Sequence, residues 1–362
     1  MGPLDFFVAS RLAMTTDFEG TQMKNMTPKL AALLAATLLS APAAAQDADF
    51  YKGKSVDLFI GYAPGGGYDT YARLVARHMG DFLPGKPSFV PKNMAGGGGR
   101  VVAAYIYNIA PKDGSAIATA DQSLVLQQAI GDTTIKFDMN KFVWIGNPSA
   151  DNNTAVTWHT TGVKTLDEAK QQEVIVGATG PNTSAQLPQV MNAILGTKFR
   201  IVQGYPGGNE MNLAMESGEI GSRGSNPWSS WKGTKPDWVK DRKINILVQI
   251  GLSKAVDLPD VPLLIDMAKN DNDRAVLRLI SAPATIGRPL FGPPGTPDAR
   301  VAMLRKAFDD MVKSKTFLDE AARERLDINP VSGMDLARII SDIVATPKPI
   351  ADRLAAIIAD PK

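Results

Sequence analysis

The chain alternates short apolar runs with longer amphipathic segments from Ser55 onward, and this alternation restricts its fold more than any other feature. Short apolar runs bounded by glycine, proline and polar residues predict strands, whereas longer segments with apolar residues three or four positions apart predict helices. Strands that alternate with helices are typical of βαβ units in a largely parallel sheet. The sequence therefore predicts an α/β fold.

The alternation occurs in two series, followed by a helical part. In the first series we expect strands at 56–60, 89–91 and 115–120 and helices from about 69 and over 101–108. Extended stretches at 142–146 and 154–159 lead into the second series, with strands expected at 174–178, 200–203 and 244–251. After the proline-rich segment 288–297, helices are expected over 298–313, 316–326, 333–344 and 351–359.

The N-terminal region has the pattern of a secretory signal peptide that starts at Met23. Two lysines precede an apolar run at 30–39, which is followed by small residues up to Ala45. The run is too short to cross a hydrocarbon core of about 30 Å, and its small-residue end predicts cleavage after Ala45; an ordinary buried helix is the alternative. We therefore exclude residues 1–45 from the fold prediction and expect a mature chain that begins at Gln46 and is exported to the periplasm.

Composition narrows the classes of function further. The chain beyond Ala45 exceeds the roughly 250–300 residues at which single cores divide, so two domains are expected. Its 39 basic and 37 acidic residues give a net charge of +2, which indicates no basic surface for nucleic acid. The absence of cysteine excludes disulfides, thiolate catalysis and a lipid-bearing cysteine. No second apolar run is long enough for a membrane helix, so a soluble protein is expected.

Motifs for nucleotide binding or catalysis fail on inspection. The glycines at 65–67 would need another glycine three residues later for a dinucleotide site, but Thr70 stands there. The segment 80–87 has the spacing of a phosphate-binding loop but ends in Pro87 instead of serine or threonine. The two histidines form no zinc pattern, and we predict no metal, no cofactor and no catalytic residue. Catalysis by carboxylates alone stays open.

Two polar turns, at 62–69 and 179–184, each join an expected strand to an expected helix. Backbone N–H groups and the positive end of the helix dipole converge at such turns, so a carboxylate can be held without a charged side chain. We expect Asp69 to cap the first helix, either alone or while also contacting a ligand, and Thr183 or Ser184 to cap the second. If the turns face each other across a cleft, they form a binding site for a small carboxylate.

Several short motifs follow one another along the chain: Pro-Gly-Gly-Gly-Tyr-Asp at 64–69, Asn-Met-Ala-Gly-Gly-Gly-Gly at 93–99, Pro-Lys-Asp-Gly at 111–114, Leu-Pro-Asp-Val-Pro at 258–262 and Pro-Pro-Gly-Thr-Pro at 293–297. This ordered set resembles the tripartite tricarboxylate transporter solute-binding receptors, also called Bug proteins. The resemblance covers essentially the whole chain beyond the signal peptide. It departs from the family at 205–208, where Pro206 replaces the usual lysine, and at 218–221.

The resemblance implies a type II periplasmic-binding-protein fold, in which two α/β domains surround a ligand cleft. We expect domain one at 46–148 plus 281–362 and domain two at 149–280. The implied function is capture of a small carboxylate, whether dicarboxylate, tricarboxylate or aromatic acid, and its delivery by a monomer to the membrane subunits of a transporter. A periplasmic sensor for a signalling partner, or a secreted enzyme acting on carboxylates, is the alternative.

The resemblance also implies that loops of both domains contact the ligand. Trp228 either shapes a distal pocket or packs in the core. Neither turn contains a basic residue, so backbone dipoles are expected to hold the carboxylate, and at most one of Arg100, Arg223 and Arg288 is expected to matter. The expected ligand-binding residues are Tyr62, Ala63, Pro64, Gly65, Gly66, Gly67, Tyr68, Asp69, Asp121, Gln122, Ser123, Thr179, Gly180, Pro181, Asn182, Thr183, Ser184, Tyr205, Ser225 and Asn226.

Overall fold

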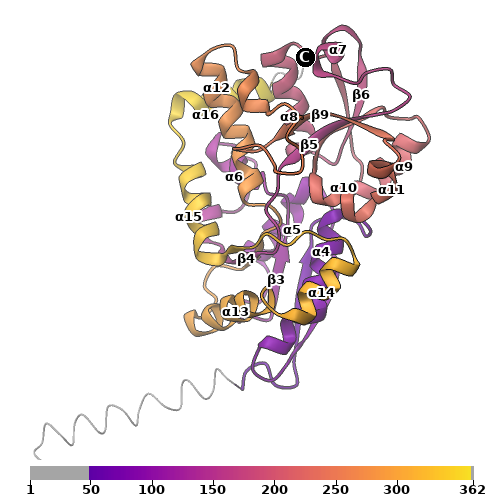
Figure 1. The fold of residues 1–362 in the computed structure, drawn as a ribbon. Helices are drawn as coiled ribbons and strands as arrows, with labels where there is room; N and C mark the ends of the chain where they lie inside the picture. Colours follow the sequence, from indigo (N-terminus) through magenta and orange to yellow (C-terminus); the bar gives the residue numbers. More distant parts are fainter. Residues whose placement is uncertain (1–48, 360–362) are drawn as a thin grey trace, which may run out of the picture. The chain divides into compact units, whose positions relative to one another are not determined.

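The computed structural model describes residues 49–359, and residues from Tyr51 onward pack as one compact unit. The predicted signal peptide and the residues before it lie outside the described residues. Within the compact unit, the strands form two sheets, which Figure 1 draws one above the other. No helix in the described part of the chain is long and apolar enough to cross a membrane.

The first sheet, called sheet one, has the strand order β11-β4-β10-β3-β1-β2. Strand β1 pairs in parallel with β2 and β3, whereas β10 runs antiparallel to β3 and β4, and β11 antiparallel to β4. Its strands are β1 Ser55–Ile60, β2 Ser88–Asn93, β3 Ala116–Thr119, β4 Val143–Asn147, β10 Leu290–Gly292 and β11 Val331–Ser332.

The second sheet, called sheet two, has the order β7-β6-β8-β5-β9. Strand β6 pairs in parallel with β7 and β8, while β5 runs antiparallel to β8 and β9. Its strands are β5 Asn153–Trp158, β6 Val174–Ala178, β7 Phe199–Gln203, β8 Ser222–Pro227 and β9 Ile244–Ile250. The expectation of a largely parallel sheet is therefore wrong, since β5 and β10 enter their sheets directly after crossovers between the two sheets and run against their neighbours.

Helices cover both sheets. They are α4 Gly67–His78, α5 Arg100–Asn108, α6 Leu124–Ala129, α7 Leu166–Gln171, α8 Thr183–Val190, α9 Gly208–Glu216, α10 Trp228–Thr234, α11 Pro236–Lys240, α12 Asp271–Ser281, α13 Asp298–Met311, α14 Lys315–Arg323, α15 Gly333–Val344 and α16 Lys348–Ala359. Single 3₁₀ turns lie at Met79–Phe82, Gly97–Gly99, Met139–Lys141, Leu264–Met267 and Ala282–Thr285, and a π-helical turn at Met191–Leu195.

The strands and helices predicted from apolar periodicity are confirmed to within a few residues, and Leu74, Val75 and His78 lie on the buried face of α4. Strands β8, β10 and β11 were not predicted. Strand β8 contains no strongly apolar residue, and β10 lies in the proline-rich segment expected to be a separator. Strand β8 is polar, and β10 and β11 have only three and two residues, so none of them carries a periodicity that a sequence can display.

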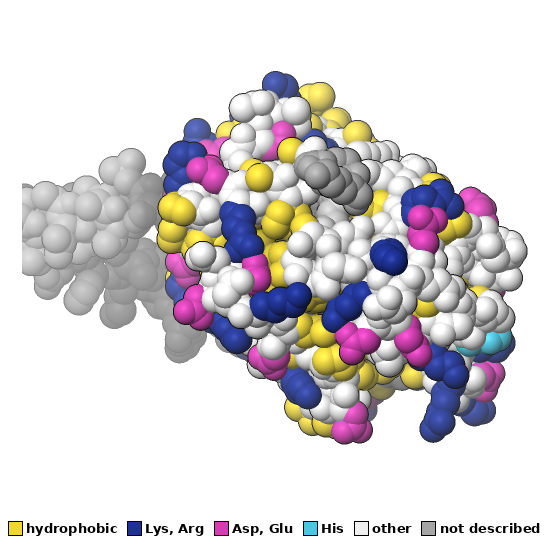
Figure 2. Space-filling view, turned by 90° about the horizontal axis from the view of Figure 1, so that it is seen from above, with side chains coloured by type: hydrophobic (Ala, Val, Ile, Leu, Met, Phe, Trp, Pro, Cys, Tyr) yellow, Lys and Arg dark blue, Asp and Glu magenta, His cyan; other side chains and the backbone are white. Residues whose placement is uncertain are grey.

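One apolar core extends through both sheets, and a second, tryptophan-rich cluster lies beside sheet two. Trp228 belongs to that second cluster and is 7% exposed, so it packs in the core. The face drawn in Figure 2 shows basic and acidic side chains interspersed instead of gathered into a region of one sign. On that face, charge gives no indication of a polyanionic partner.

The predicted division into two domains stays a proposal. Sheet one combines strands from both ends of the described chain, since β10 and β11 stand beside β3 and β4. The last helix, α16, packs against α12 and α8, which accompany sheet two. A division that assigns all of 281–362 to domain one therefore has to accommodate a C-terminal helix that crosses to the other sheet.

Candidate ligand-binding cleft

A cavity of about 50 Å³ lies among loops that follow the carboxyl ends of strands in both sheets. Ligands of open α/β sheets bind at this edge. The cavity is lined by Tyr62, Gly66, Gly67, Tyr68, Asp121, Gln122, Thr179, Asn182, Thr183, Ser184, Gly208, Met211, Arg223, Ser225, Asn226, Pro227 and Ser230.

The first turn leads from β1 into α4. Gly66 is the N-cap residue and offers no side-chain cap, while Asp69 lies in the first helical turn and accepts the Gly65 N–H at 2.9 Å. Asp69 also accepts from Arg73 Nε at 2.9 Å and from Asn93 Nδ2 at 2.8 Å. Burial opposes the charged form of Asp69, but these hydrogen bonds outweigh it and lower the pKa of the carboxyl. Asp69 thus holds the turn in place through these hydrogen bonds and does not line the cavity.

The second turn leads from β6 into α8. Its N-cap is Asn182, whose Oδ1 accepts the Ser184 N–H at 3.0 Å, so the prediction of Thr183 or Ser184 as the cap is wrong. Asn182 has extended backbone angles, as an N-cap requires, whereas Thr183 already begins the helix. The Nδ2 of Asn182 donates to the Tyr62 hydroxyl at 3.0 Å and to Thr179 Oγ1 at 2.8 Å. The cap of the second turn therefore also contacts the first turn.

Asp121 joins both turns from the end of β3. Its Oδ2 accepts from the Tyr62 hydroxyl at 2.7 Å and from Thr183 Oγ1 at 3.3 Å. Its Oδ1 accepts from the Ser123 N–H at 2.9 Å and from Ser123 Oγ at 2.5 Å. Burial, and then the nearby Asp121 charge, raise the pKa of Tyr62 well above its ordinary value, so the phenol stays protonated and donates. Four donors thus occupy this carboxylate.

Arg223 is a buried cation on the cavity wall. Its Nη1 donates to Asn212 Oδ1 and its Nη2 to Asn226 Oδ1, both at 2.8 Å, and its guanidinium lies 4.8 Å from the centre of the Trp231 ring. Within the described part of the chain, no carboxylate oxygen lies within 4.0 Å of it. Burial lowers the pKa of Arg223 to about 9. The charge of Arg223 is therefore solvated by neutral groups only.

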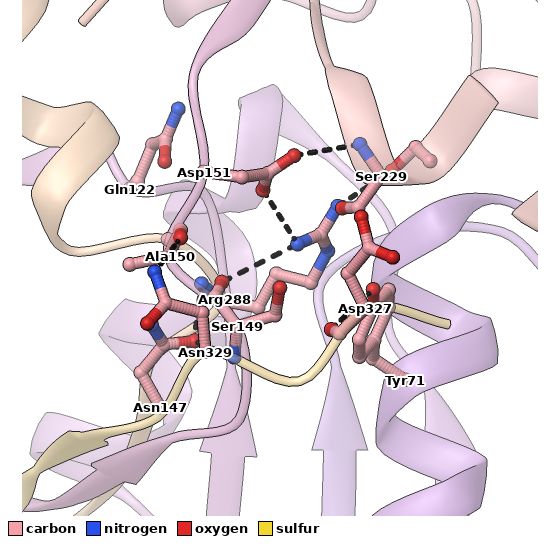
Figure 3. Close-up of polar contacts among 12 residues, drawn as sticks. Tyr71, Gln122, Asn147, Ser149, Ala150, Asp151, Ser229, Arg288, Asp327 and Asn329 are labelled. Atoms are coloured by element: carbon pink, nitrogen blue, oxygen red, sulfur yellow. Dashed lines mark hydrogen bonds and ion pairs between the residues drawn. The ribbon is translucent and has the colours of Figure 1, made fainter. Parts of the chain in front are cut away.

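Arg288 is also buried, but it is compensated. Figure 3 shows its guanidinium beside Asp151, whose Oδ1 lies 3.2 Å from Nη1, with Tyr71 below it. Its Nη2 donates to the hydroxyls of Ser229 and Ser230 at 2.9 and 2.7 Å. Burial opposes the charge of Arg288, but Asp151, Tyr71 and Tyr68 together outweigh this effect and raise the pKa. Arg288 does not line the cavity but positions Ser230, which does.

No family model matches the chain. A UPF0065 protein from the gbd 5′ region of Cupriavidus necator is 25% identical over 333 residues, which span 90% of this chain and 95% of that protein.

Several solved structures match more than four fifths of the chain. Rpa4515 of Rhodopseudomonas palustris with adipate has a TM-score of 0.66 at 18% identity and covers 85% of this chain and 98% of its own. MatC of the same organism, with bound malate, has a TM-score of 0.66 at 17% identity and covers 83% and 99%. The periplasmic binding protein BugD has a TM-score of 0.68 at 16% identity and covers 85% and 98%.

The chain resembles the Bug receptors in fold. The resemblance and the periplasmic-binding-protein fold class predicted from the motifs are confirmed.

The cavity brings together many of the residues expected to bind ligand, from both turns, from the end of β3 and from β8. Tyr205 points elsewhere, since its hydroxyl donates to Glu219 at 2.5 Å. The other expected residues that do not line the cavity are Ala63, Pro64, Gly65, Asp69, Ser123, Gly180 and Pro181.

Five residues that line the cavity were not among the expected ligand contacts. They are Gly208, Met211, Arg223, Pro227 and Ser230. Gly208 belongs to the glycine pair in the segment 205–208 that departs from the family, and this pair is the signal that could have identified it. Arg223 is one of three arginines of which at most one was expected to matter. Nothing in the sequence distinguishes Met211 or Ser230, because an isolated residue on an unexpected helix or strand carries no pattern.

Proposed function

We propose that the protein is a periplasmic solute-binding protein that captures a small carboxylate in this cleft and delivers it to a tripartite tricarboxylate-type membrane transporter. The observation that carries the proposal is Arg223, a buried cation at the cavity with no carboxylate beside it. A buried charge is costly unless it is paired, and an anionic ligand supplies the missing partner.

The two turns support the same ligand chemistry. Gly66 and Gly67 line the cavity at the start of α4, where backbone N–H groups and the helix dipole favour an anion. Asp121 does not attract a cation strongly, because its oxygens already accept from Tyr62, Thr183 and Ser123. The carboxylates bound by two similar proteins, adipate by Rpa4515 and malate by MatC, agree with this charge pattern.

Calorimetry of the mature chain with a panel of monocarboxylates, dicarboxylates, tricarboxylates and aromatic acids tests the capture step. We expect at least one acid to bind reversibly at one site per chain and to be recovered unchanged. The Arg100→Met variant should bind the acid as the wild type does and serves as a control for the loss of a basic residue away from the cavity. Arg100 pairs with Asp132 at 2.6 Å and does not line the cavity. If no acid in the panel binds, the proposed function is wrong.

Delivery and location need separate experiments. N-terminal sequencing of the protein from a periplasmic fraction should give Gln46 as the first residue. Co-purification with the large and small membrane subunits of a cognate transporter should depend on the bound acid. A chain that stays in the cytoplasm, or that binds its acid but never the transporter, would contradict delivery.

A further inference from the structure

A groove of about 690 Å³ lies outside the ligand cleft, between helices that accompany different sheets. One wall is α11, which follows α10 and β8 of sheet two, and the other is α14, which packs against α4 on the sheet-one side. The lining includes Val239 of α11 and Leu318 and Ala322 of α14. The groove is much larger than the ligand cavity of about 50 Å³ and shares no lining residue with it.

Most of the side chains that line this groove are apolar, and the charged ones are mainly basic. The basic residues are Lys232, Lys240 and Arg325, and Asp327 is the acidic residue of the described lining. Asp327 already pairs with Lys232 at 2.5 Å. Among residues 49–359, no carboxylate oxygen lies within 4.0 Å of Lys240 or Arg325. The groove therefore combines an apolar lining with two cations that have no acidic partner in the described chain.

Arg325 stands at a position where glycine is the favoured residue. It follows the C-cap Glu324 of α14 and has a left-handed backbone conformation, with φ of 57°. The Leu326 N–H donates to the Ala321 carbonyl at 2.8 Å, which is the helix ending that glycine usually permits. Glycine would adopt this conformation with less strain than arginine. The advantage of arginine here lies in its side chain, which lines the groove.

The groove is formed by both sides of the cleft together. Lys232 of α10 pairs with Asp327, which follows α14, so an ion pair joins its two walls. A Cβ on Gly233 would lie 2.7 Å from Leu326 Cδ2, so α10 packs directly on the end of α14. A movement that separates the two sheets would also separate the walls of the groove. A partner that occupies the groove therefore favours the closed arrangement, as a ligand in the cleft does.

We propose that the groove between α11 and α14 is a docking surface for an acidic amphipathic helix of the transporter's membrane subunits. This inference rests on the proposed function and assigns a surface to its delivery step. The apolar face of such a helix would pack against the apolar lining, and its carboxylates would pair with Lys240 and Arg325. A second copy of this chain fits less well, because a twofold dimer through the groove would bring the same cations together.

The test measures binding of the acid-loaded protein to the cognate large and small membrane subunits in lipid nanodiscs. Arg325→Gly removes a cation where glycine is favoured, so the melting temperature should stay the same or rise. Leu318→Gln makes an apolar side chain polar at a position that is 40% exposed. Each variant should weaken docking about fivefold or more. Acid binding should stay unchanged, because neither residue lines the cavity.

Two matched controls separate the groove from general surface effects. Arg242→Gly makes the same substitution in the same left-handed conformation, with φ of 53°, after α11, and Arg242 does not line the groove. Met334→Gln makes a similar change on α15, where Met334 is 73% exposed and also lies outside the groove. Both control variants should dock as the wild type does.

Unchanged docking of Arg325→Gly and Leu318→Gln would overturn the groove proposal, and so would equal losses in the two controls. Equal binding to nanodiscs without the subunits would assign the groove to lipid headgroups, and a dimer in light scattering that these variants dissociate would assign it to a second copy. In each of these cases carboxylate capture still stands. If the loaded wild type never binds the subunits, docking and delivery fail together. If no acid binds, capture fails, and docking of the unloaded chain decides the groove.

Discussion

The two buried arginines, Arg223 and Arg288, differ in whether an acidic side chain pairs with them. Arg288 pairs with Asp151 at 3.2 Å, and its side chain is 1% exposed. Replacing it by methionine leaves Asp151 without its cation, so Arg288→Met should lower the free energy of unfolding by about 3 kcal/mol. Arg100→Met, which breaks a more exposed pair, should cost about 1 kcal/mol or less. Urea denaturation measures both, and equal losses would contradict this account of Arg288.

Gly67 is a second residue at which a single change should separate binding from folding. A Cβ at this position would overlap Ser230 Oγ and lie 2.9 Å from Ser230 Cβ, across the cavity from α4. Gly67→Ala should therefore prevent the two walls from closing and weaken ligand binding about tenfold or more, with little change in melting temperature. Calorimetry and thermal unfolding measure the two effects.

The double variant Gly67→Ala, Ser230→Gly provides the control, because it removes the overlapping atoms. Affinity should return toward that of Ser230→Gly alone. If Gly67→Ala weakens binding as much in the Ser230→Gly background as in the wild type, the steric explanation is wrong.

The residues of the two turns could be predicted from the sequence because the residue types there favour particular backbone conformations. Glycine permits close approach, and asparagine, serine, threonine and aspartate mark helix starts. The N-cap was placed one or two residues late at 183–184 because adjacent Asn182, Thr183 and Ser184 all favour the same position. Arg223 could not be singled out, since its importance lies in the absence of a carboxylate, and only the folded chain shows which side chains surround it.

At the scale of elements, apolar periodicity predicts interior strands such as β3 and β6 as well as edge strands, but it misses β8, β10 and β11. Every residue of β8 from Ser222 to Asn226 is buried, yet the strand is polar because it forms a wall of the cleft. The same function that requires donors on this strand removes the apolar signal by which strands are found. The prediction of a largely parallel sheet was also wrong. Crossovers between the sheets reverse the direction of β5 and β10, and a reversed direction leaves no trace in the composition of a strand.

The turn between β1 and α4 is an element whose stability should depend on pH. Hydrogen bonds from Arg73, Asn93 and Gly65 outweigh the effect of burial and lower the pKa of Asp69 from its ordinary value of 3.8. A lowered folded-state pKa means that this stabilisation is complete above pH 3.8 and is lost as pH falls through the folded value. Asp69→Asn should thus cost about 1 kcal/mol at pH 7, and the difference from wild type should shrink below pH 4.

Urea denaturation of both proteins between pH 7 and pH 3 measures this difference. Asp113→Asn serves as a comparison, because Asp113 also has a lowered pKa but lies at a turn outside the cleft. A difference between wild type and Asp69→Asn that stays constant down to pH 3 would show that the charge of Asp69 does not stabilise the turn. If Asp69→Asn also weakens ligand binding at pH 7, the turn geometry matters for the site.

At the scale of the whole compact unit, direct contacts close the cleft. Tyr62 on the sheet-one side contacts Asn182 on the sheet-two side, and Asp121 contacts Thr183. Lys232 bridges Asp257 and Asp327 at 2.7 and 2.5 Å, which adds an ion pair between α10 and the segment after α14. These contacts join the two sides of the cleft, so we expect ligand binding to be linked to their opening and closing.

A ligand held by groups from both sheets binds the closed arrangement better than an open one and must shift the population toward closure. Small-angle scattering should therefore give a smaller radius of gyration with a saturating carboxylate than without it. Gly67→Ala should keep the larger radius even when the acid is present, because its Cβ prevents closure at Ser230. A radius that does not change when the wild type is saturated would mean that the cleft is closed before binding. In that case affinity would come from the preformed donors of the cavity alone, and Gly67→Ala would have to act on those donors.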